Sequence, residues 1–254
     1  KYYVNDITNE KIALCMADKT DTIVTLTEGT TEVNQYAFYG CTTLTEITIP
    51  NSVKNIGDRA FDNCSSLTSV TILEGATSMT GIGDYAVAGC SSLASVIMPE
   101  RLSNIGIWAI YECSNLTEIK VPEGVTHIKD RTFYNCSSLT EITIPSSVTS
   151  IGSEAFYRCR SLAIVYNNSN LTITAGRGTY SGIALYAKEV VNKDEVAQGK
   201  IETIDNVKYY INDTTNEKIS LYVVDKTVST VSLAEGTTEI EGWTFSGYAN
   251  LTSV

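Results

Sequence analysis

The chain has 254 residues, of which 43% are hydrophobic and 19% charged, and its formal net charge is −11. This composition indicates a folded chain and excludes a disordered one. The acidic charge argues against nucleic acid and anionic membranes as partners, because both require a basic surface. No run of about 18 apolar residues occurs, so we expect no insertion into a membrane.

Residues 1–17 alternate apolar and polar side chains on either side of the polar turn NDITNE. This pattern predicts a β-hairpin running from Tyr3 to Leu14. The first coil of a repeat array would otherwise expose apolar area and unpaired strand groups. We therefore predict that the hairpin caps the N-terminal end of the array that follows.

Residues 18–166 repeat with a period of 23, most clearly in CSSLTEITIPSSVTSIGSEAFYR, which begins at Cys136. A fixed period of this size predicts a solenoid, in which each coil contacts only its neighbours. The motif L-x-x-I-x-I points alternate side chains inward and favours a strand, which the following proline ends. We expect the strands of successive coils to form one parallel sheet along a face of the solenoid.

The rest of each unit predicts turns. In V-x-x-I-G the glycine is expected to supply a backbone angle that other residues disfavour; it recurs as Gly57, Gly83, Gly106 and Gly152, with Lys129 in its place in one copy. The A-F-x-x-C segment is too short for a full helix, so a 3₁₀ turn or a single helical turn is expected on the face opposite the sheet. The fold class is therefore an α/β repeat that is mostly β.

The cysteines raise a choice between disulfides and free thiols. Equivalent residues of successive coils lie about 5 Å apart, but their parallel side chains disfavour the torsion of a disulfide. A free thiol packs as a small apolar group and can donate to a turn carbonyl. We predict a buried ladder of free thiols and no metal site, since ligand spacing is absent; the ladder comprises Cys41, Cys64, Cys90, Cys113, Cys136 and Cys159.

The repeat C-x-x-L-T-x-I-x-I-P-x-x-V-x-x-I-G-x-x-A-F-x-x-C resembles the BspA-like, Treponema-type leucine-rich repeats of bacterial surface proteins. The resemblance covers residues 18–166 and resumes after residue 225. It implies a leucine-rich repeat solenoid that is secreted or displayed on the cell surface, in a family associated with adhesion. Three departures concern local geometry: an insertion near Ala76–Met79, Lys129 in the glycine column, and Val87 and Ile110 in the phenylalanine column.

After Cys159 the repeat decays, and we assign residues 167–207 to a closing unit and a polar linker. Residues 183–191 carry apolar side chains at helical spacing, which predicts a short helix there. Residues 208–254 then repeat residues 1–47, so that Lys208 corresponds to Lys1. This predicts a second hairpin and the start of a second array, in a monomeric piece of a longer modular protein.

No catalytic constellation emerges. His127 is the only histidine, and the cysteines have no histidine partner for thiol chemistry. Glu118 and Glu141 share an outward column and would lie about 5 Å apart in adjacent coils, a separation that suits glycosidase chemistry but also a solvated acidic stripe. We expect the acidic stripe, no enzyme activity and no cofactor.

A binding role remains, and the outward side chains of the sheet are its candidates. They are Glu46, Thr48, Ser69, Thr71, Ser95, Ile97, Glu118, Lys120, Glu141, Thr143 and Tyr166. We predict a scaffold for adhesion or interaction that binds extracellular proteins through this face, many weak contacts acting together. The alternatives are a carbohydrate-binding module of a surface protein and a structural spacer.

Overall fold

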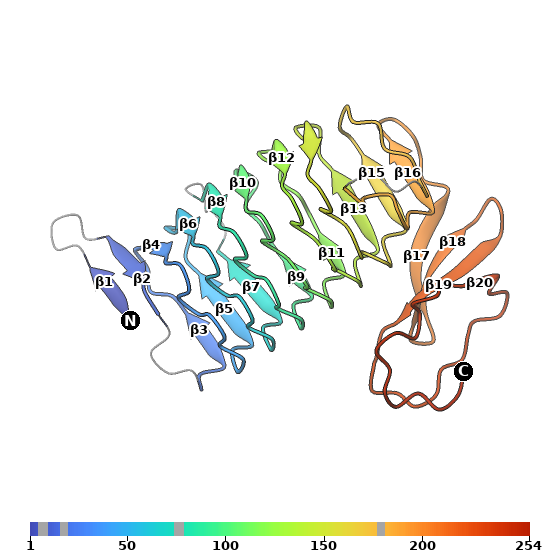
Figure 1. The fold of residues 1–254 in the computed structure, drawn as a ribbon, viewed down its shortest axis with the longest axis horizontal. Coiled ribbons are helices and arrows are strands. Elements are labelled where there is room, and N and C mark those ends of the chain that lie inside the picture. Colours follow the sequence, from blue (N-terminus) through green and yellow to red (C-terminus); the bar gives the residue numbers. More distant parts are fainter. Residues whose placement is uncertain (5–9, 16–19, 74–78, 177–180) are drawn as a thin grey trace.

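The computed structural model describes residues 1–4, 10–15, 20–73, 79–176 and 181–254. Within these residues every regular element is a β-strand, and the strands stack into a series of coils with the first hairpin at one end (Figure 1). The predicted leucine-rich repeat solenoid is confirmed. The insertion noted near residue 76 falls mainly on residues outside the described ranges.

Two strand rows run along the solenoid. The first row carries the predicted sheet, and the second forms from the x-I pair before each glycine, where we had expected only a turn. The first row contains β3 (Ile23–Thr25), β5 (Glu46–Ile49), β7 (Ser69–Ile72), β9 (Ser95–Val96), β11 (Glu118–Ile119), β13 (Glu141–Ile144), β15 (Ile164–Asn167) and β16 (Glu189–Asn192). The second contains β4 (Thr30–Val33), β6 (Asn55–Ile56), β8 (Gly81–Ile82), β10 (Asn104–Ile105), β12 (His127–Ile128) and β14 (Ser150–Ile151).

Both rows are interrupted at the coil that begins at Cys113. The first row splits into β11-β9-β7-β5-β3 and β13-β15-β16, and the second ends at β10 before β12–β14 begins. Two sequence departures explain the second interruption. Lys129 replaces a glycine, and Ile107 replaces an aspartate whose Oδ1 elsewhere accepts a backbone N–H from the next coil, as Asp84 does from Ile107 at 2.8 Å.

The glycine column has a different physical cause from the one that we predicted. Gly106 is not among the residues with positive φ. A Cβ added there would instead lie 2.4 Å from the carbonyl carbon of Gly83, so the column exists because adjacent coils approach too closely for a side chain. Positive φ occurs at other positions of each coil, such as Arg131 (φ 53°) and Asn135 (φ 60°).

The A-F-x-x-C segments are not helical, which corrects our expectation of 3₁₀ or helical turns. Their backbone alternates between bonds within the coil, as from Tyr157 N to Glu154 O, and bonds to the next coil, as from Phe133 N to Ala155 O at 2.8 Å. Residues with positive φ interrupt any run of helical dihedrals. The turns therefore form a second inter-coil ladder on the side away from the sheet.

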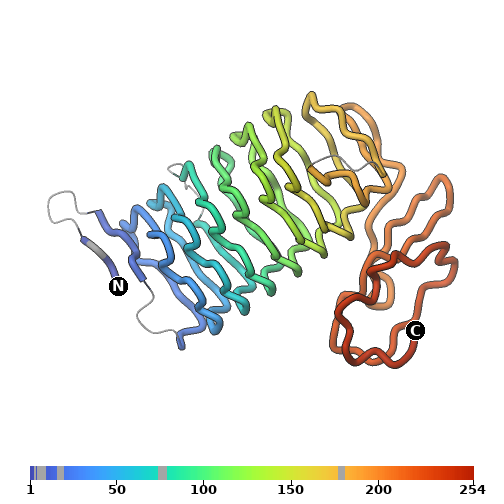
Figure 2. Tube along the Cα trace, in the orientation of Figure 1, coloured from blue at the N-terminus to red at the C-terminus, as the bar shows by residue number. Residues whose placement is uncertain are grey.

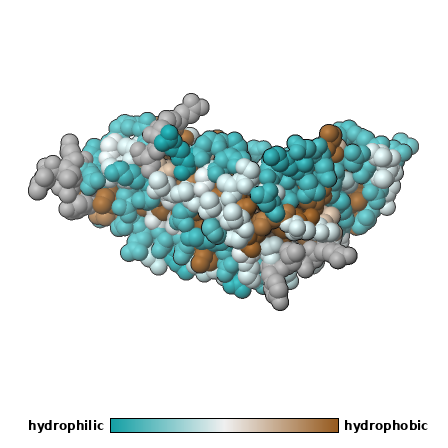
Figure 3. Space-filling view, turned by 90° about the horizontal axis from the view of Figure 1, so that it is seen from above, coloured by the Kyte–Doolittle hydropathy of each residue, from teal (hydrophilic) through white to brown (hydrophobic). Residues whose placement is uncertain are grey.

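The core is continuous through the array, because each column stacks on itself. Phe133 and Phe156 stack with ring centroids 5.0 Å apart, and Val87 and Ile110 fill the same column as buried residues. The outside is mostly hydrophilic with scattered apolar patches, as Figure 3 shows for the face seen from above. The inward and outward sides of the strands are thus those that the alternation predicted.

At its two ends the solenoid meets hairpins (Figure 2). The first consists of β1 (Tyr2–Val4) and β2 (Lys11–Ala13), and β2 continues in parallel with β4. The second end carries β17 (Gly199–Ile204), β18 (Val207–Asn212), β19 (Glu217–Val223) and β20 (Glu239–Ile240) as one four-stranded sheet.

Two predictions about residues 167–207 are wrong. The segment that we expected to be helical ends in the strand β16, whose Val190 pairs with Val165 of β15 and so extends the first row by one strand. The expected linker contains β17, which pairs with β18 over its whole length. β-branched residues at Val190, Val191, Ile201 and Ile204 favour strands, and the neighbouring strand edges supply partners.

Candidate functional site

Two columns of side chains point outward from the first strand row. Parallel pairing in register places Glu46 beside Ser69 and Ser69 beside Ser95, and it places Thr48 beside Thr71. The same register continues from Ser95 to Glu118 and, on the far side of the interruption, from Thr143 to Tyr166. The eleven predicted residues therefore lie on one face.

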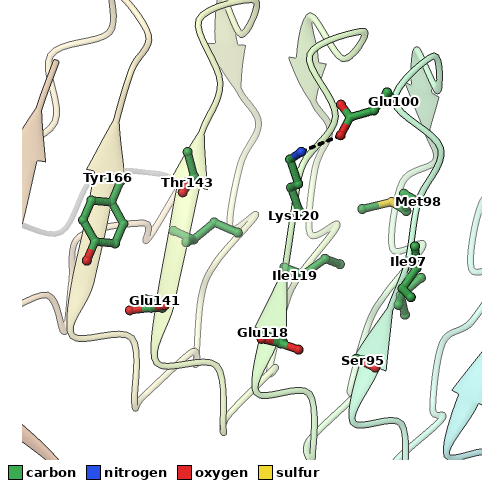
Figure 4. A pocket seen from close by; sticks show the side chains of 12 residues that line it. Ser95, Ile97, Met98, Glu100, Glu118, Ile119, Lys120, Glu141, Thr143 and Tyr166 are labelled. Carbon is green, nitrogen blue, oxygen red and sulfur yellow. Dashed lines mark hydrogen bonds and ion pairs between the residues drawn. The ribbon is translucent and has the colours of Figure 1, made fainter. Parts of the chain in front are cut away.

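Seven of them meet in a hollow of about 470 Å³. Its walls come from β9, β11, β13 and β15 (Figure 4). The predicted residues in it are Ser95, Ile97, Glu118, Lys120, Glu141, Thr143 and Tyr166, and the others are Val96, Met98, Glu100, Ile119 and Ile142. Glu46, Thr48, Ser69 and Thr71 lie on the same face but outside the hollow, on β5 and β7.

The hollow lies where the sheet is interrupted. β9 and β11 have two residues each, whereas β7 and β13 have four. Between β11 and β13 the strand pairing is reduced to a single bridge that joins Lys120 to Thr143. The hollow therefore coincides with the shortest strands of the row and with the gap in its pairing, and not with β5 and β7.

Carboxylates dominate the electrostatics of the hollow. Glu118 and Glu141 are exposed within it. Lys120 supplies a positive charge, but its Nζ donates to Glu100 Oε1 at 2.5 Å, and this hydrogen bond and the charge of Glu100 raise the pKa of Lys120. The pKa of Tyr166 is raised by burial and then by the charges of Glu141 and Glu189. The hollow is therefore acidic, and its lysine is already engaged.

An apolar side chain stands among these charges. Ile97 is 68% exposed, although its column holds Thr48, Thr71 and Thr143 in other coils. Met98 lies next to it in the wall of the hollow, as Figure 4 shows. The hollow therefore contains an exposed apolar side chain as well as carboxylates.

The part of the chain that the structure describes contains no group of three or more histidine, cysteine, aspartate or glutamate side chains that could hold a metal ion. In the same residues no helix is long and apolar enough to cross a membrane. His127 is exposed, and its Nδ1 lies 2.8 Å from the Thr126 hydroxyl.

Comparison with known proteins identifies the repeat. A family model described as the BspA type leucine rich repeat region matches residues 15–80 and 73–180, with six copies. The chain belongs to the BspA-type leucine-rich repeat family. The resemblance stated from the sequence is thereby confirmed. The comparison with curated proteins gave no match.

Similar folds occur among solved structures. A leucine-rich repeat protein from Bacteroides ovatus is 34% identical, with 57% of this chain and 37% of that one covered and a TM-score of 0.52. A leucine rich cell surface protein from Faecalibacterium prausnitzii shares the fold at 21% identity, with 93% of this chain and 63% of that one covered and a TM-score of 0.52. The pneumococcal vaccine antigen PcpA shares it at 18% identity, with 99% of this chain and 61% of that one covered and a TM-score of 0.53. The chain thus spans less than two thirds of each of these three structures.

The cysteine column of this BspA-type array is buried and free of disulfides. Cys136 Sγ donates to Ile110 O of the preceding coil at 3.1 Å, and Cys159 Sγ donates to Phe133 O at 3.0 Å. Burial raises the pKa of Cys113 to about 12. A buried thiol that is neutral at ordinary pH is a structural group and not a nucleophile.

A second surface of the BspA-type coils was missed by the sequence reasoning. Half-buried rings stack along the turns, among them Tyr85 and Trp108 with centroids 5.6 Å apart. The guanidinium of Arg59 lies 4.1 Å from the centroid of Tyr85, and that of Arg131 lies 4.6 Å from that of Trp108. We call this row the turn ridge; it comprises Tyr36, Tyr39, Arg59, Tyr85, Trp108, Tyr111, Arg131, Tyr134, Tyr157 and Arg158.

The signal for the turn ridge is present in the sequence. Its residues lie next to the A-F pair of each coil, at positions that the repeat motif leaves unspecified. Aligned coil by coil, these positions hold mainly tyrosine, tryptophan and arginine, as in Tyr85, Trp108 and Arg131. Such columns predict stacking between coils, since equivalent positions lie about 5 Å apart.

Proposed function

We propose that this chain is a non-enzymatic scaffold for adhesion or interaction that binds extracellular protein partners through its sheet face. The observation that carries the proposal is the hollow, which is lined by Glu118, Glu141 and Tyr166 together with the exposed Ile97. A partner would contact the apolar side chain of Ile97 and place basic groups beside the carboxylates of Glu118 and Glu141. Contacts of this kind on a repeated surface add up to useful affinity.

The chemistry of the hollow supports a basic partner. Glu118 and Glu141 attract basic groups, whereas Glu100 and Lys120 are engaged with each other. The fitting ligand is a protein segment that carries lysine or arginine side chains next to an apolar residue. Long-range attraction by a chain of net charge −11 favours the same class of partner.

The proposal includes an extracellular or cell-surface location. It is supported by membership in the BspA-type family and by the description of the Faecalibacterium prausnitzii structure as a cell surface protein. Fractionation of the source cells with an antibody against this chain would test it. Recovery in the cytoplasmic fraction alone would contradict it.

Binding can be tested with immobilised extracellular matrix proteins at low and high salt. The double variant Glu118→Gln, Glu141→Gln should lower affinity for a basic partner about tenfold, because each exposed charge contact contributes up to about 1 kcal/mol and about 1.4 kcal/mol is a factor of ten. The control, Glu28→Gln with Glu235→Gln, removes equal charge from exposed residues away from the hollow. Equal affinity of both double variants would contradict the assignment of the hollow.

One observation favours carbohydrate as a second candidate ligand. The turn ridge presents half-buried aromatic rings, such as Trp108 and Tyr111, which lie 4.8 Å apart at their centroids. A glycan array, with Trp108→Ala as the variant, tests this alternative on a surface separate from the hollow. Glycan binding that Trp108→Ala abolishes and the hollow variant leaves intact would favour it. No binding in either assay would favour the spacer and overturn both.

A further inference from the structure

The two hairpins are copies of one element. Tyr3 pairs with Ile12 in the first, and Tyr210 pairs with Ile219 in the second, at equivalent positions of the repeated sequence. Inner contacts are also shared: Tyr2 Oη accepts from Thr27 N at 3.1 Å, and the equivalent Tyr209 Oη accepts from Ala234 N at 2.9 Å. Both hairpins therefore attach to their own arrays in the same way.

Their outer faces differ in what covers them. In the second hairpin Ile219 and Leu221 pack in a buried apolar cluster with Ala163, Ile164 and Val191, which belong to the closing coils of the first array. Leu221 is 3% exposed there. This contact joins the second module to the end of the first array, where Figure 1 shows β17–β19 beside β15 and β16.

On the first hairpin the equivalent face is uncovered. Leu14, the counterpart of Leu221, is 39% exposed, and Ile12, the counterpart of the buried Ile219, is half-buried. Ile12 of β2 and Leu14 just after it thus present apolar side chains to solvent at positions whose copies in this same chain are covered by protein.

The strand edges differ in the same way. β18 pairs with β19 on one side and with β17 on the other. The pairing with β17 covers six residue pairs, from Gly199 with Asn212 to Ile204 with Val207. β1 is the last strand of its sheet, and among the described residues no strand pairs with its outer edge. An apolar face together with an open edge is the arrangement that proteins normally cover.

Charge supports the same partner. Lys188, in the closing coils of the first array, lies 3.8 Å from Glu239 and also pairs with Glu241. Glu32 occupies the position of Glu239 in the first module, and Asn34 occupies that of Glu241. One of the two carboxylates that meet the lysine is thus present beside the first hairpin.

We propose that the outer face of the first hairpin, centred on Ile12 and Leu14, is a docking surface for the closing coils of another array of this type carried ahead of it in the same polypeptide. The contact would repeat the one that Ile219 and Leu221 make with Ala163, Ile164 and Val191. This contact would hold the two arrays in a fixed orientation, without a flexible linker between them.

A graft within the full chain tests this proposal. Residues 1–15 replace residues 208–222, so that the first hairpin is presented to the closing coils, and the original Cys15 is changed to serine. The thiol carried by the graft then takes the position of Tyr222, which packs against the apolar cluster. Its rate of labelling should fall at least about tenfold below that of Cys15 in the unaltered chain, because a covered thiol reacts only after local opening.

Matched variants identify the contact. Leu14→Asp within the graft should restore fast labelling, whereas Ile23→Asp, at an exposed apolar residue away from the hairpin face, should not. A grafted thiol that reacts as fast as Cys15 would overturn the proposal. Protection of Cys15 in the unaltered chain that increases with protein concentration would mean that a second copy covers the face, which would overturn the proposed partner.

Discussion

Cys113 donates its thiol hydrogen to the carbonyl oxygen of Val87 in the preceding coil, with Sγ and O 3.2 Å apart. The same bond recurs between Cys90 and Phe61 at 3.2 Å. A small donor in this column both fills the core and satisfies a carbonyl that the turn leaves pointing inward. The column is therefore selected for packing and hydrogen bonding together.

Thiol labelling should separate Cys15 from the other six cysteines. Cys15 is exposed, and the six of the column are buried. In the folded protein we expect one thiol to react quickly with a thiol reagent, and Cys15→Ser to remove that reaction. After denaturation all the remaining thiols should react. A second fast thiol in the folded state would contradict the buried column.

Alkaline pH should destabilise the fold. Burial raises the pKa of Cys113 to about 12 and raises those of Cys90 and Cys136, so the folded state retains protons that the unfolded state releases above its ordinary thiol pKa. For Cys113, stability is fully present below about pH 9 and falls as the pH rises toward about 12, by about 1.4 kcal/mol for each pH interval of one across that range, and Cys90 and Cys136 act in the same direction. Urea midpoints that are equal at about pH 8 and about pH 10.5 would contradict this.

Gly106→Ala should be costly. The new Cβ would lie 2.4 Å from Gly83 backbone atoms, which cannot move without separating the coils. Overpacking of this kind costs about 1–3 kcal/mol, measured as the change in the free energy of unfolding. Gly242→Ala is the control, because nothing lies within 4 Å of its added Cβ. A similar cost at both positions would show that the close approach is not the cause.

Restoring the repeat at the interruption should extend the second strand row. Lys129→Gly removes the side chain from the glycine column, and Ile107→Asp returns the acceptor that Asp84 provides elsewhere. In the double variant we expect slower hydrogen exchange at the amide of residue 129 and pairing of β10 with β12. The control, Lys54→Gly with Ile23→Asp, makes the same types of substitution elsewhere. It should leave the rate of hydrogen exchange at the amide of residue 129 unchanged.

The period of the sequence predicted the fold because it is reinforced in every coil. Leu139, Ile142 and Ile144 are buried, as the strand motif requires, and Phe156 stacks in its column. The outward columns followed from the same alternation, so Glu118 and Glu141 could be assigned to one face from the sequence alone.

Interactions between coils could not be predicted in this way. The hollow depends on how few bonds join β11 to β13, and the pattern of residues within a single coil does not report this. The strand β16 was mistaken for a helix because Ile183, Tyr186 and Val190 have helical spacing, whereas the open edge of β15 decides the outcome. The glycine column was correctly located, but its cause is contact between neighbouring coils.

The interrupted coil around Lys129 has a mechanical consequence. β4–β10 form one paired segment of the second row and β12–β14 form another, while the cysteine and turn ladders run through both. Bending at this coil breaks no strand pair of the second row, whereas bending elsewhere does. The first row has its own gap one coil further on, between β11 and β13, where only the bridge from Lys120 to Thr143 joins the strands and a change in curvature alters the spacing of Glu118 and Glu141.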